Sequence, residues 1–342
     1  MPLNARLLGY DSRPMRYRTL GKGGPIVSAI SMGRGSQGIK LEDEPGVAAF
    51  NATIRRAFEL GINFFDSSDA YWGTRHEVLL GRAVREFRDR VLVSSKFGNI
   101  DLPGGGKATN GRPEYVQKSC EASLERMGVE VIDVYYLHRV DPVVPIEETI
   151  GAMARLIEQG KVRWIGICEA GPETLRRAHR ACPISVLQTE YSLWFREVER
   201  DIIPVCRELG IGYVAYAPLG RGLLTGRIRK VEDLAPNDRR RQHPRFQPEN
   251  LARNIKMVEA LEAMARGRGV TAAQLALAWL LAQGEDIVPI PGTNHLKNVE
   301  LNAAAADIRL SPEKVERLSE IFAIGAGAGK RYHDKVLKGV GI

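Results

Sequence analysis

Cysteine is scarce in this sequence, whose 342 residues include four: Cys120, Cys168, Cys182 and Cys206. They form no CxxC pair and have no histidine partner at the spacing of a metal site. This pattern favours free thiols in a reducing compartment over a disulfide framework, and it predicts no bound metal.

Long apolar runs and an export signal are also missing. The longest apolar run, around Leu275 to Ala282, is too short to span a bilayer. The arginines near the N-terminus are not followed by the apolar segment that a secretory signal requires. We therefore expect a soluble, cytoplasmic protein with no membrane partner.

The charge is positive but has no nucleic-acid pattern. A net charge of +8 permits attraction to an anionic ligand or to a nucleic acid. Lysine and arginine are mostly scattered, however, and no stripe of basic and aromatic residues is present. The charge alone leaves nucleic-acid binding as an alternative. Because the pattern is missing, we expect no nucleic-acid partner.

What the sequence does contain is a regular alternation of strand-like and helix-like segments. Eight such strands predict a parallel sheet, and the count favours a closed (β/α)8 barrel, with one domain over residues 1–342 because no linker interrupts the pattern. The strands are expected near 29–32, 62–66, 91–95, 131–137, 162–168, 185–190, 211–216 and 286–290. The helices are expected near 46–60, 75–87, 113–127, 146–159, 172–181, 199–209, 255–283 (broken at Gly267–Gly269) and 295–305.

The two ends of the chain add elements to the barrel. Tyr17 to Leu20 and Ile26 to Ser28 predict a small hairpin before the first barrel strand. Ser311 followed by Pro312 predicts the start of a helix beyond the eighth repeat. The Gly- and Ala-rich stretch from Ala323 to Gly329 is expected to be mobile.

Two glycine-rich stretches resemble phosphate-binding loops only superficially. Gly33 to Gly38 fits GxGxxG, but a charged loop follows where a dinucleotide fingerprint needs a helix, so we expect a tight loop at the barrel mouth. Gly104 to Ala108 lacks the terminal Ser or Thr of a P-loop and predicts a flexible loop.

Three predicted strands end on ionisable residues: Asp66, Lys96 and His138, with Tyr71 five residues after Asp66. The carboxyl ends of parallel barrel strands meet at the face where such barrels carry their chemistry. Each residue alone has a plain alternative, a polar side chain at the exit of a strand. Together they predict a site at this face.

These residue types can polarise a carbonyl group. A lysine near a tyrosine lowers the tyrosine pKa from about 10, and a carboxylate paired to the lysine fixes its position. A histidine can hydrogen-bond and orient the carbonyl oxygen. The site supplies no nucleophile and no metal, so a hydride from a nicotinamide is the natural reactant at carbon.

On these residues the chain resembles the aldo-keto reductases over nearly its full length. The resemblance implies a (β/α)8 barrel, NAD(P)H-dependent carbonyl reduction, and a catalytic tetrad of Asp66, Tyr71 as proton donor, Lys96 and His138. The matching segments are Tyr17–Gly21, Gly61–Tyr71, Ser94–Gly98, Tyr135–Pro142, Gly166–Ala170, Gln188–Leu193, Tyr216–Gly226 and Ile290–Asn302.

The resemblance also implies a cofactor site, with NADPH expected and NAD as the alternative. Tyr216 would stack on the nicotinamide and the loop after it would follow the pyrophosphate. The implied cofactor-binding residues are Gly33, Asp66, Cys168, Glu169, Gln188, Tyr216, Ala217, Pro218, Leu219, Gly220, Arg221, Arg227, Gly292, Asn294, Asn298 and Asn302.

The chain departs from the family at several of these positions. Cys168 stands where Ser is common, Asn294 and His295 where Lys or Arg is common, and Leu301 where an adenine-binding Glu is common. The basic run Arg239–Arg245 is either a solvated loop or a lid over the anionic cofactor.

We therefore expect an NADPH-dependent enzyme that reduces small aldehydes or ketones to alcohols. The alternative is a cofactor-binding barrel with little turnover that reports redox state to a partner. The substrate and the oligomeric state are left open by the sequence.

Overall fold

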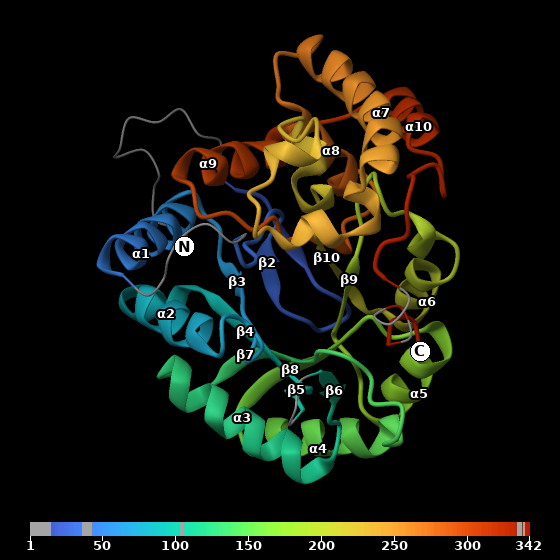
Figure 1. The fold of residues 1–342 in the computed structure, drawn as a ribbon. Helices are drawn as coiled ribbons and strands as arrows, with labels where there is room; N and C mark the ends of the chain where they lie inside the picture. Colours follow the sequence, from blue (N-terminus) through green and yellow to red (C-terminus); the bar gives the residue numbers. More distant parts are fainter. Residues whose placement is uncertain (1–14, 36–42, 103–105, 334–336, 338) are drawn as a thin grey trace.

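A parallel sheet of seven strands forms the centre of the computed structural model, which describes residues 15–35, 43–102, 106–333, 337 and 339–342 (Figure 1). The strands pair in chain order, and every pair is parallel. Helices lie around the outside of the sheet (Figure 1). The strands are β3 (Phe64–Asp66), β4 (Leu92–Phe97), β7 (Ile132–Leu137), β8 (Val162–Cys168), β9 (Val186–Glu190), β10 (Gly212–Tyr216) and β11 (Ile287–Pro289).

The first predicted barrel strand, at 29–32, is not a ladder strand. Instead, isolated parallel bridges join Met32 to Phe65 in β3, and Gly33 to Gly292 just beyond β11. This segment therefore connects the two edges of the sheet and closes it. The prediction of a (β/α)8 barrel is confirmed, although the closure uses two bridges rather than a full strand.

Ten α-helices lie within the described residues, and they follow the predicted pattern closely. The helices are α1 (Glu44–Glu59), α2 (Arg75–Val84), α3 (Pro113–Met127), α4 (Ile146–Glu158), α5 (Pro172–Ala181), α6 (Ile202–Leu209), α7 (Pro248–Arg266), α8 (Ala272–Leu281), α9 (Leu296–Ala304) and α10 (Pro312–Ile321). None of them is long and apolar enough to cross a membrane. The break predicted at Gly267–Gly269 is confirmed, since α7 ends at Arg266 and Thr271 and Gln274 cap the start of α8 reciprocally. The predicted start at 255 is too late, because α7 begins at Pro248.

Short 3₁₀ helices fill many of the connections, especially after β10. Their bounds are η2 (Arg85–Arg90), η3 (Glu197–Glu199), η4 (Gly220–Thr225), η5 (Val231–Asp233), η6 (Arg239–Gln242), η7 (Pro244–Phe246) and η8 (Ala305–Asp307).

Two antiparallel hairpins accompany the barrel. The predicted one, β1 (Tyr17–Thr19) with β2 (Ile26–Ser28), is confirmed. A second one, β5 (Asn99–Asp101) with β6 (Lys107–Thr109), was not predicted. The prediction of a loop at 104–108 is therefore wrong for Lys107 and Ala108, while 103–105 lie outside the described residues, as do 36–38 of the first glycine-rich stretch.

The interior of the barrel is an apolar layer that the β1–β2 hairpin helps to fill. Leu20 and Val27 flank the hairpin turn and pack with Phe64, Val134 and Val214 from three barrel strands, all five fully buried. Strands buried on both faces are typical of parallel barrels. The hairpin packs into the interior, and the site lies where the strands end.

The C-terminal region is more firmly attached than its composition indicates. The helix predicted to start at Pro312 is confirmed as α10. In the stretch 323–329, which we expected to be mobile, the Ala328 N–H donates to Asn254 Oδ1 at 2.8 Å and Asn254 Nδ2 donates to the Ala328 carbonyl at 3.0 Å. Asn254 is fully buried in α7, so this pair anchors the segment.

Two helical glycines should respond oppositely to alanine. A Cβ at Gly81 in α2 would lie 1.8 Å from the Met127 carbonyl oxygen at the end of α3, so Gly81→Ala must push the two helices apart and should destabilise the protein by about 1–3 kcal/mol. Gly151 in α4 has no atom within 4 Å of the same position, so Gly151→Ala should stabilise by about 0.5–1 kcal/mol. Urea unfolding measures both, and equal shifts would contradict the packing argument.

Candidate active site

A buried ion pair lies where β3 and β4 end. The Lys96 ammonium contacts Asp66 Oδ2 and donates to the Ser67 carbonyl at 2.7 Å. The other carboxylate oxygen, Asp66 Oδ1, accepts from Ser94 Oγ at 2.8 Å and from Gln188 Nε2 at 2.9 Å. Both charges are thus desolvated, but each has hydrogen-bond partners, which is what a buried pair needs to be tolerated. This network fixes where the ammonium lies.

Tyr71 and His138 complete the predicted group of four. The Lys96 Nζ atom is 5.2 Å from the centroid of the Tyr71 ring, and the His138 ring lies edge-on to Tyr71 at 6.0 Å. Ser68 Oγ is 3.1 Å from His138 Nδ1 and so orients the imidazole. Three strand ends and the loop after β3 therefore bring all four predicted side chains together.

Burial sets the protonation states of the two rings. Burial, together with the charges of Arg139 and Lys96, holds the pKa of His138 well below its ordinary value, so the imidazole is neutral at pH 7. Burial also raises the pKa of Tyr71, while Lys96 and Arg34 lower it in part. The predicted contribution of Lys96 has the right sign, but the prediction of a lowered pKa is wrong for this structure because burial outweighs it.

A second cluster lies beside the ends of β8 and β10. The Tyr216 hydroxyl donates to Glu169 Oε1 at 2.6 Å and is 3.0 Å from the Tyr332 hydroxyl. Arg331 donates to both oxygens of Glu169, at 3.1 and 2.5 Å. The C-terminal segment therefore holds the two residues that the resemblance places around a nicotinamide. Sequence reasoning missed Arg331 and Tyr332, since nothing in their local pattern separates them from surface residues.

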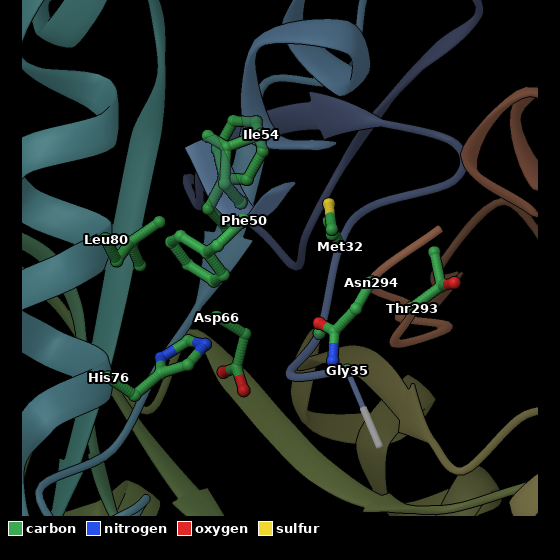
Figure 2. Close-up of a pocket in the computed structure, with 11 residues that line it drawn as sticks. Met32, Gly35, Phe50, Ile54, Asp66, His76, Leu80, Thr293 and Asn294 are labelled. Carbon is green, nitrogen blue, oxygen red and sulfur yellow. The ribbon is translucent and has the colours of Figure 1, made fainter. Parts of the chain in front are cut away.

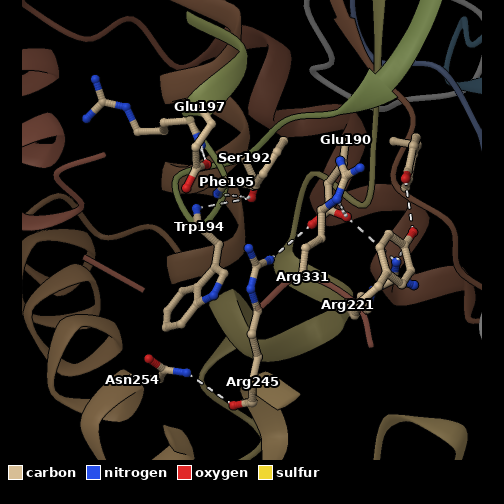
Figure 3. A network of polar contacts seen from close by, with 12 residues as sticks. Glu190, Ser192, Trp194, Phe195, Glu197, Arg221, Arg245, Asn254 and Arg331 are labelled. Carbon is tan, nitrogen blue, oxygen red and sulfur yellow. Dashed lines mark hydrogen bonds and ion pairs between the residues drawn. The ribbon is translucent and has the colours of Figure 1, made fainter. Parts of the chain in front are cut away.

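The basic run Arg239–Arg245 is not a plain solvated loop throughout, because two of its arginines contact residues at the end of the barrel. Arg245 Nη1 is 3.1 Å from Glu190 Oε1, a carboxylate with no exposed surface, and Arg221 and Arg331 approach its other oxygen (Figure 3). Arg240 donates to the Arg221 carbonyl at 2.9 Å. Arg245 and Arg240 therefore contact residues at the end of β9 and in the loop after β10, so a plain solvated loop is wrong for them, while a lid over the cofactor stays a prediction.

Left-handed backbone conformations are concentrated at this end of the barrel. Every described non-glycine residue with positive φ follows β3, β8 or β10, the strands that carry the two clusters. Such conformations cost about 1–3 kcal/mol each and persist where the surroundings impose them, commonly at functional sites. The residues are Trp72, Thr74, Glu169, Ala217 and Arg221.

The loops that close the barrel pack tightly behind Asp66. A Cβ at Gly35 would lie 2.0 Å from Asn294 Oδ1, and a Cβ at Gly292 would lie 1.8 Å from the Arg34 carbonyl oxygen. Figure 2 shows Asn294 pointing toward Gly35, across from Asp66. The cavity between them has a volume of about 10 Å³, room for roughly one water.

The remaining residues of the implied cofactor site occupy two neighbouring regions of the same end. Cys168 is the last residue of β8, and burial raises its pKa to about 12, so its thiol stays protonated. Arg227 Nη2 is 3.3 Å from Asn298 Oδ1 in the first turns of α9. Ala217, Pro218, Leu219 and Gly220 connect β10 to Arg221 in η4, and Asn302 is buried in α9.

Comparisons with known proteins agree with this geometry. The chain matches the model of the aldo/keto reductase family over residues 31–323. It is 44% identical over 320 residues to the probable aldo-keto reductase 1 of Glycine max, covering 92% of this chain and 91% of that protein.

Solved structures are similar over most of the chain. The glycerol dehydrogenase of Gluconobacter oxydans has a TM-score of 0.80 at 27% identity, covering 92% of this chain and 96% of that chain. An aldo/keto reductase from Klebsiella pneumoniae, solved in complex with NADP and acetate, has a TM-score of 0.70 at 26% identity, covering 92% and 98%. With a family model over most of its length and a barrel that matches its relatives, the chain belongs to the aldo/keto reductase family of oxidoreductases.

Proposed function

We propose that this protein reduces aldehydes or ketones to alcohols with NADPH, and that Tyr71 is the proton donor. The observation that carries the proposal is the Tyr71 ring, held between His138 and the buried Lys96–Asp66 pair at the ends of three strands. Relatives solved with NADP support the choice of cofactor.

The residues beside β8 and β10 fit a nicotinamide dinucleotide by their chemistry. The half-buried Tyr216 ring offers a flat apolar face for stacking. Glu169 and the amide of Gln188 can accept from and donate to a carboxamide. Three arginines, Arg221, Arg245 and Arg331, surround the Glu190 carboxylate, so this region carries a net positive charge that would attract an anionic ligand. Tyr216, Glu169, Gln188, Arg221 and Arg227 would therefore hold the cofactor.

The reaction divides between the cofactor and the protein. When bound, the reduced nicotinamide supplies a hydride to the carbonyl carbon. The Tyr71 O–H donates its proton to the carbonyl oxygen, so the product is an alcohol. The Lys96 ammonium stabilises the negative charge that develops on the Tyr71 oxygen. The neutral His138 can hydrogen-bond the same carbonyl oxygen and orient it.

A panel of aldehydes and ketones, read by the loss of NADPH absorbance, tests this proposal. We expect multiple turnovers with at least some small aldehydes. A single-turnover experiment with bound NADPH separates an enzyme from a redox-reporting barrel with little turnover. No oxidation of bound NADPH by any carbonyl compound would contradict the proposal.

We expect a moderate preference for NADPH over NADH that depends on Arg227. This exposed arginine is hydrogen-bonded to Asn298 close to the start of α9, where a phosphate would also meet free N–H groups. Losing one charge-assisted contact should lower the kcat/KM ratio of NADPH to NADH by about 10–100-fold in Arg227→Ala. The preference should also shrink as salt rises, because exposed charges are screened.

The matched control is Arg229→Ala, two residues away. Arg229 is occupied by Glu262, with both contacts at 2.6 Å, so its removal should leave the ratio nearly unchanged. A better kcat/KM with NADH at low and at high ionic strength would show that the expected preference is wrong.

A further inference from the structure

Arg34 is a cation beside the proposed proton donor, and none of the described residues gives it an acidic partner. Its guanidinium carbon lies 4.8 Å from the centroid of the Tyr71 ring and 5.2 Å from that of Trp72. Arg34 is half-buried and directly follows Met32 and Gly33, the two residues whose bridges close the barrel. Within the described part of the chain, the guanidinium contacts these two rings, and no carboxylate or carbonyl oxygen accepts a hydrogen bond from it.

The contrast with Lys96 shows what is unusual. Both cations lie about the same distance from the Tyr71 ring, at 5.2 Å for Lys96 and 4.8 Å for Arg34. Lys96 is neutralised by Asp66 and also donates to the Ser67 carbonyl. No described residue accepts from the N–H donors of Arg34, so this half-buried guanidinium can still bind an anion.

The charges around Arg34 favour an anionic ligand. Burial lowers the pKa of Arg34; Tyr71 raises it in part, while the positive charges of Arg239 and Arg221 lower it further. Arg221 is engaged by Tyr332 and Glu190, whereas Arg239 is exposed and has no acidic partner among the described residues. The surroundings of Arg34 and Tyr71 therefore carry positive charge from Arg221 and Arg239, and no described carboxylate contacts Arg34.

We propose that Arg34 binds a carboxylate on the substrate, so that the preferred substrates are aldehydes or ketones that also carry a carboxylate group. This inference rests on the proposed carbonyl reduction and names its substrate class. A planar guanidinium binds a carboxylate through two parallel hydrogen bonds, which would orient the molecule as well as hold it. Its carbonyl group would then reach the Tyr71 hydroxyl.

The position of Arg34 favours the substrate over the cofactor as the source of the anion. Arg34 lies against the ring of Tyr71, which is the proposed proton donor, and against the ring of the adjacent Trp72. The phosphates are assigned instead to the loop 217–221 and to Arg227, which follow β10. Both sources have the same anionic chemistry, so the experiment must separate them.

Paired substrates test the proposal directly. The 2-, 3- and 4-isomers of carboxybenzaldehyde are compared with the matching nitrobenzaldehydes, which have a similar shape but no charge. In wild type, at least one carboxylate isomer should have the higher kcat/KM. Arg34→Met should lower kcat/KM for that isomer by about 10–100-fold and change the nitro compound by less than about threefold. Arg34→Lys should keep part of the preference, because it retains the charge.

Two ligand-binding measurements do not depend on turnover. Benzoate, titrated calorimetrically into the NADP complex, should bind wild type more tightly than Arg34→Met, while benzamide should bind both equally. The Kd of NADPH, followed by fluorescence, should be unchanged in the variant. Arg55→Met controls for the loss of one positive charge, because Arg55 is an exposed arginine of α1 that is paired with Glu86.

Several outcomes would overturn the proposal. Equal losses for charged and neutral aldehydes in both Arg34 variants would mean that Arg34 acts on Tyr71 or on the fold. A weaker NADPH Kd without any substrate discrimination would assign the anion to the cofactor. If wild type reduces nitrobenzaldehydes but shows no carboxylate preference, the inference fails while the proposed reductase function stands. If neither series is reduced, the proposed function itself fails.

Discussion

Replacing Tyr71 by phenylalanine should lower carbonyl reduction by about 10²–10⁴-fold, the usual contribution of a positioned proton donor. The hydroxyl is the one group lost, and the ring contacts with His138, Lys96 and Arg34 can all persist. The Kd of NADPH should stay nearly constant, because the hydroxyl serves the substrate. Stopped-flow measurement of the hydride-transfer step gives the comparison.

The pH profile provides the control for this assignment. Burial raises the pKa of Tyr71, so the donor stays protonated through neutral and moderately alkaline pH. The rate of reduction in wild type should therefore fall only above about pH 10, the ordinary tyrosine pKa. Near-full hydride-transfer rates in Tyr71→Phe, or an alkaline limb well below pH 9 that survives in this variant, would show that another group donates the proton.

The second large effect is expected at the buried ion pair. Lys96→Met should abolish turnover and also reduce the free energy of unfolding by about 3–5 kcal/mol, because it leaves Asp66 charged and buried without its counterion. Ser94 and Gln188 still donate to Asp66, but neither brings a positive charge. Urea unfolding and kcat/KM are measured on the same preparation.

The double variant Asp66→Asn/Lys96→Met separates the two effects. Removing both charges should recover much of the lost stability, since no uncompensated charge remains. Activity should be little lower than in Lys96→Met alone, because residues that act as a unit are not additive. A coupled pair would be contradicted if the activity losses of the two single variants multiplied in the double variant and their stability losses added.

The C-terminal segment gives the cofactor side of the site its rigidity. Arg331 and Tyr332 contact Glu169, Tyr216 and Arg221, so residues from the far end of the chain fix the side chains that would face the nicotinamide. Arg331 also packs on the Phe195 ring at 4.4 Å. The proton-donating side, by contrast, consists of residues at the ends of β3, β4 and β7 and in the loop after β3, with Gln188 of β9 donating to Asp66. The two halves of the site therefore depend on different parts of the chain.

Local pattern in the sequence was sufficient for most of the barrel. Apolar periodicity located α3, α4 and α5 to within a residue, because each helix buries one regular stripe. The short apolar runs located β7 and β8 in the same way. The tetrad was predictable for a related reason: Asp66, Lys96 and His138 follow from strand ends, and parallel strands bring their ends together. That the chain forms one domain stays a prediction.

Interactions between distant segments could not be obtained in this way. The pKa of Tyr71 depends on how completely the barrel buries it, and a sequence pattern does not contain that balance between burial and charge. The closure by two bridges at Met32 and Gly33 depends on both edges of the sheet. What the sequence alone determined was therefore each element and the residues at its end. Tertiary structure decided the partners: it pairs Arg331 with Glu169 and Arg245 with Glu190. It leaves Arg34 with no acidic partner among the described residues. The reason is that ion pairs depend on distance in space and not on separation along the chain.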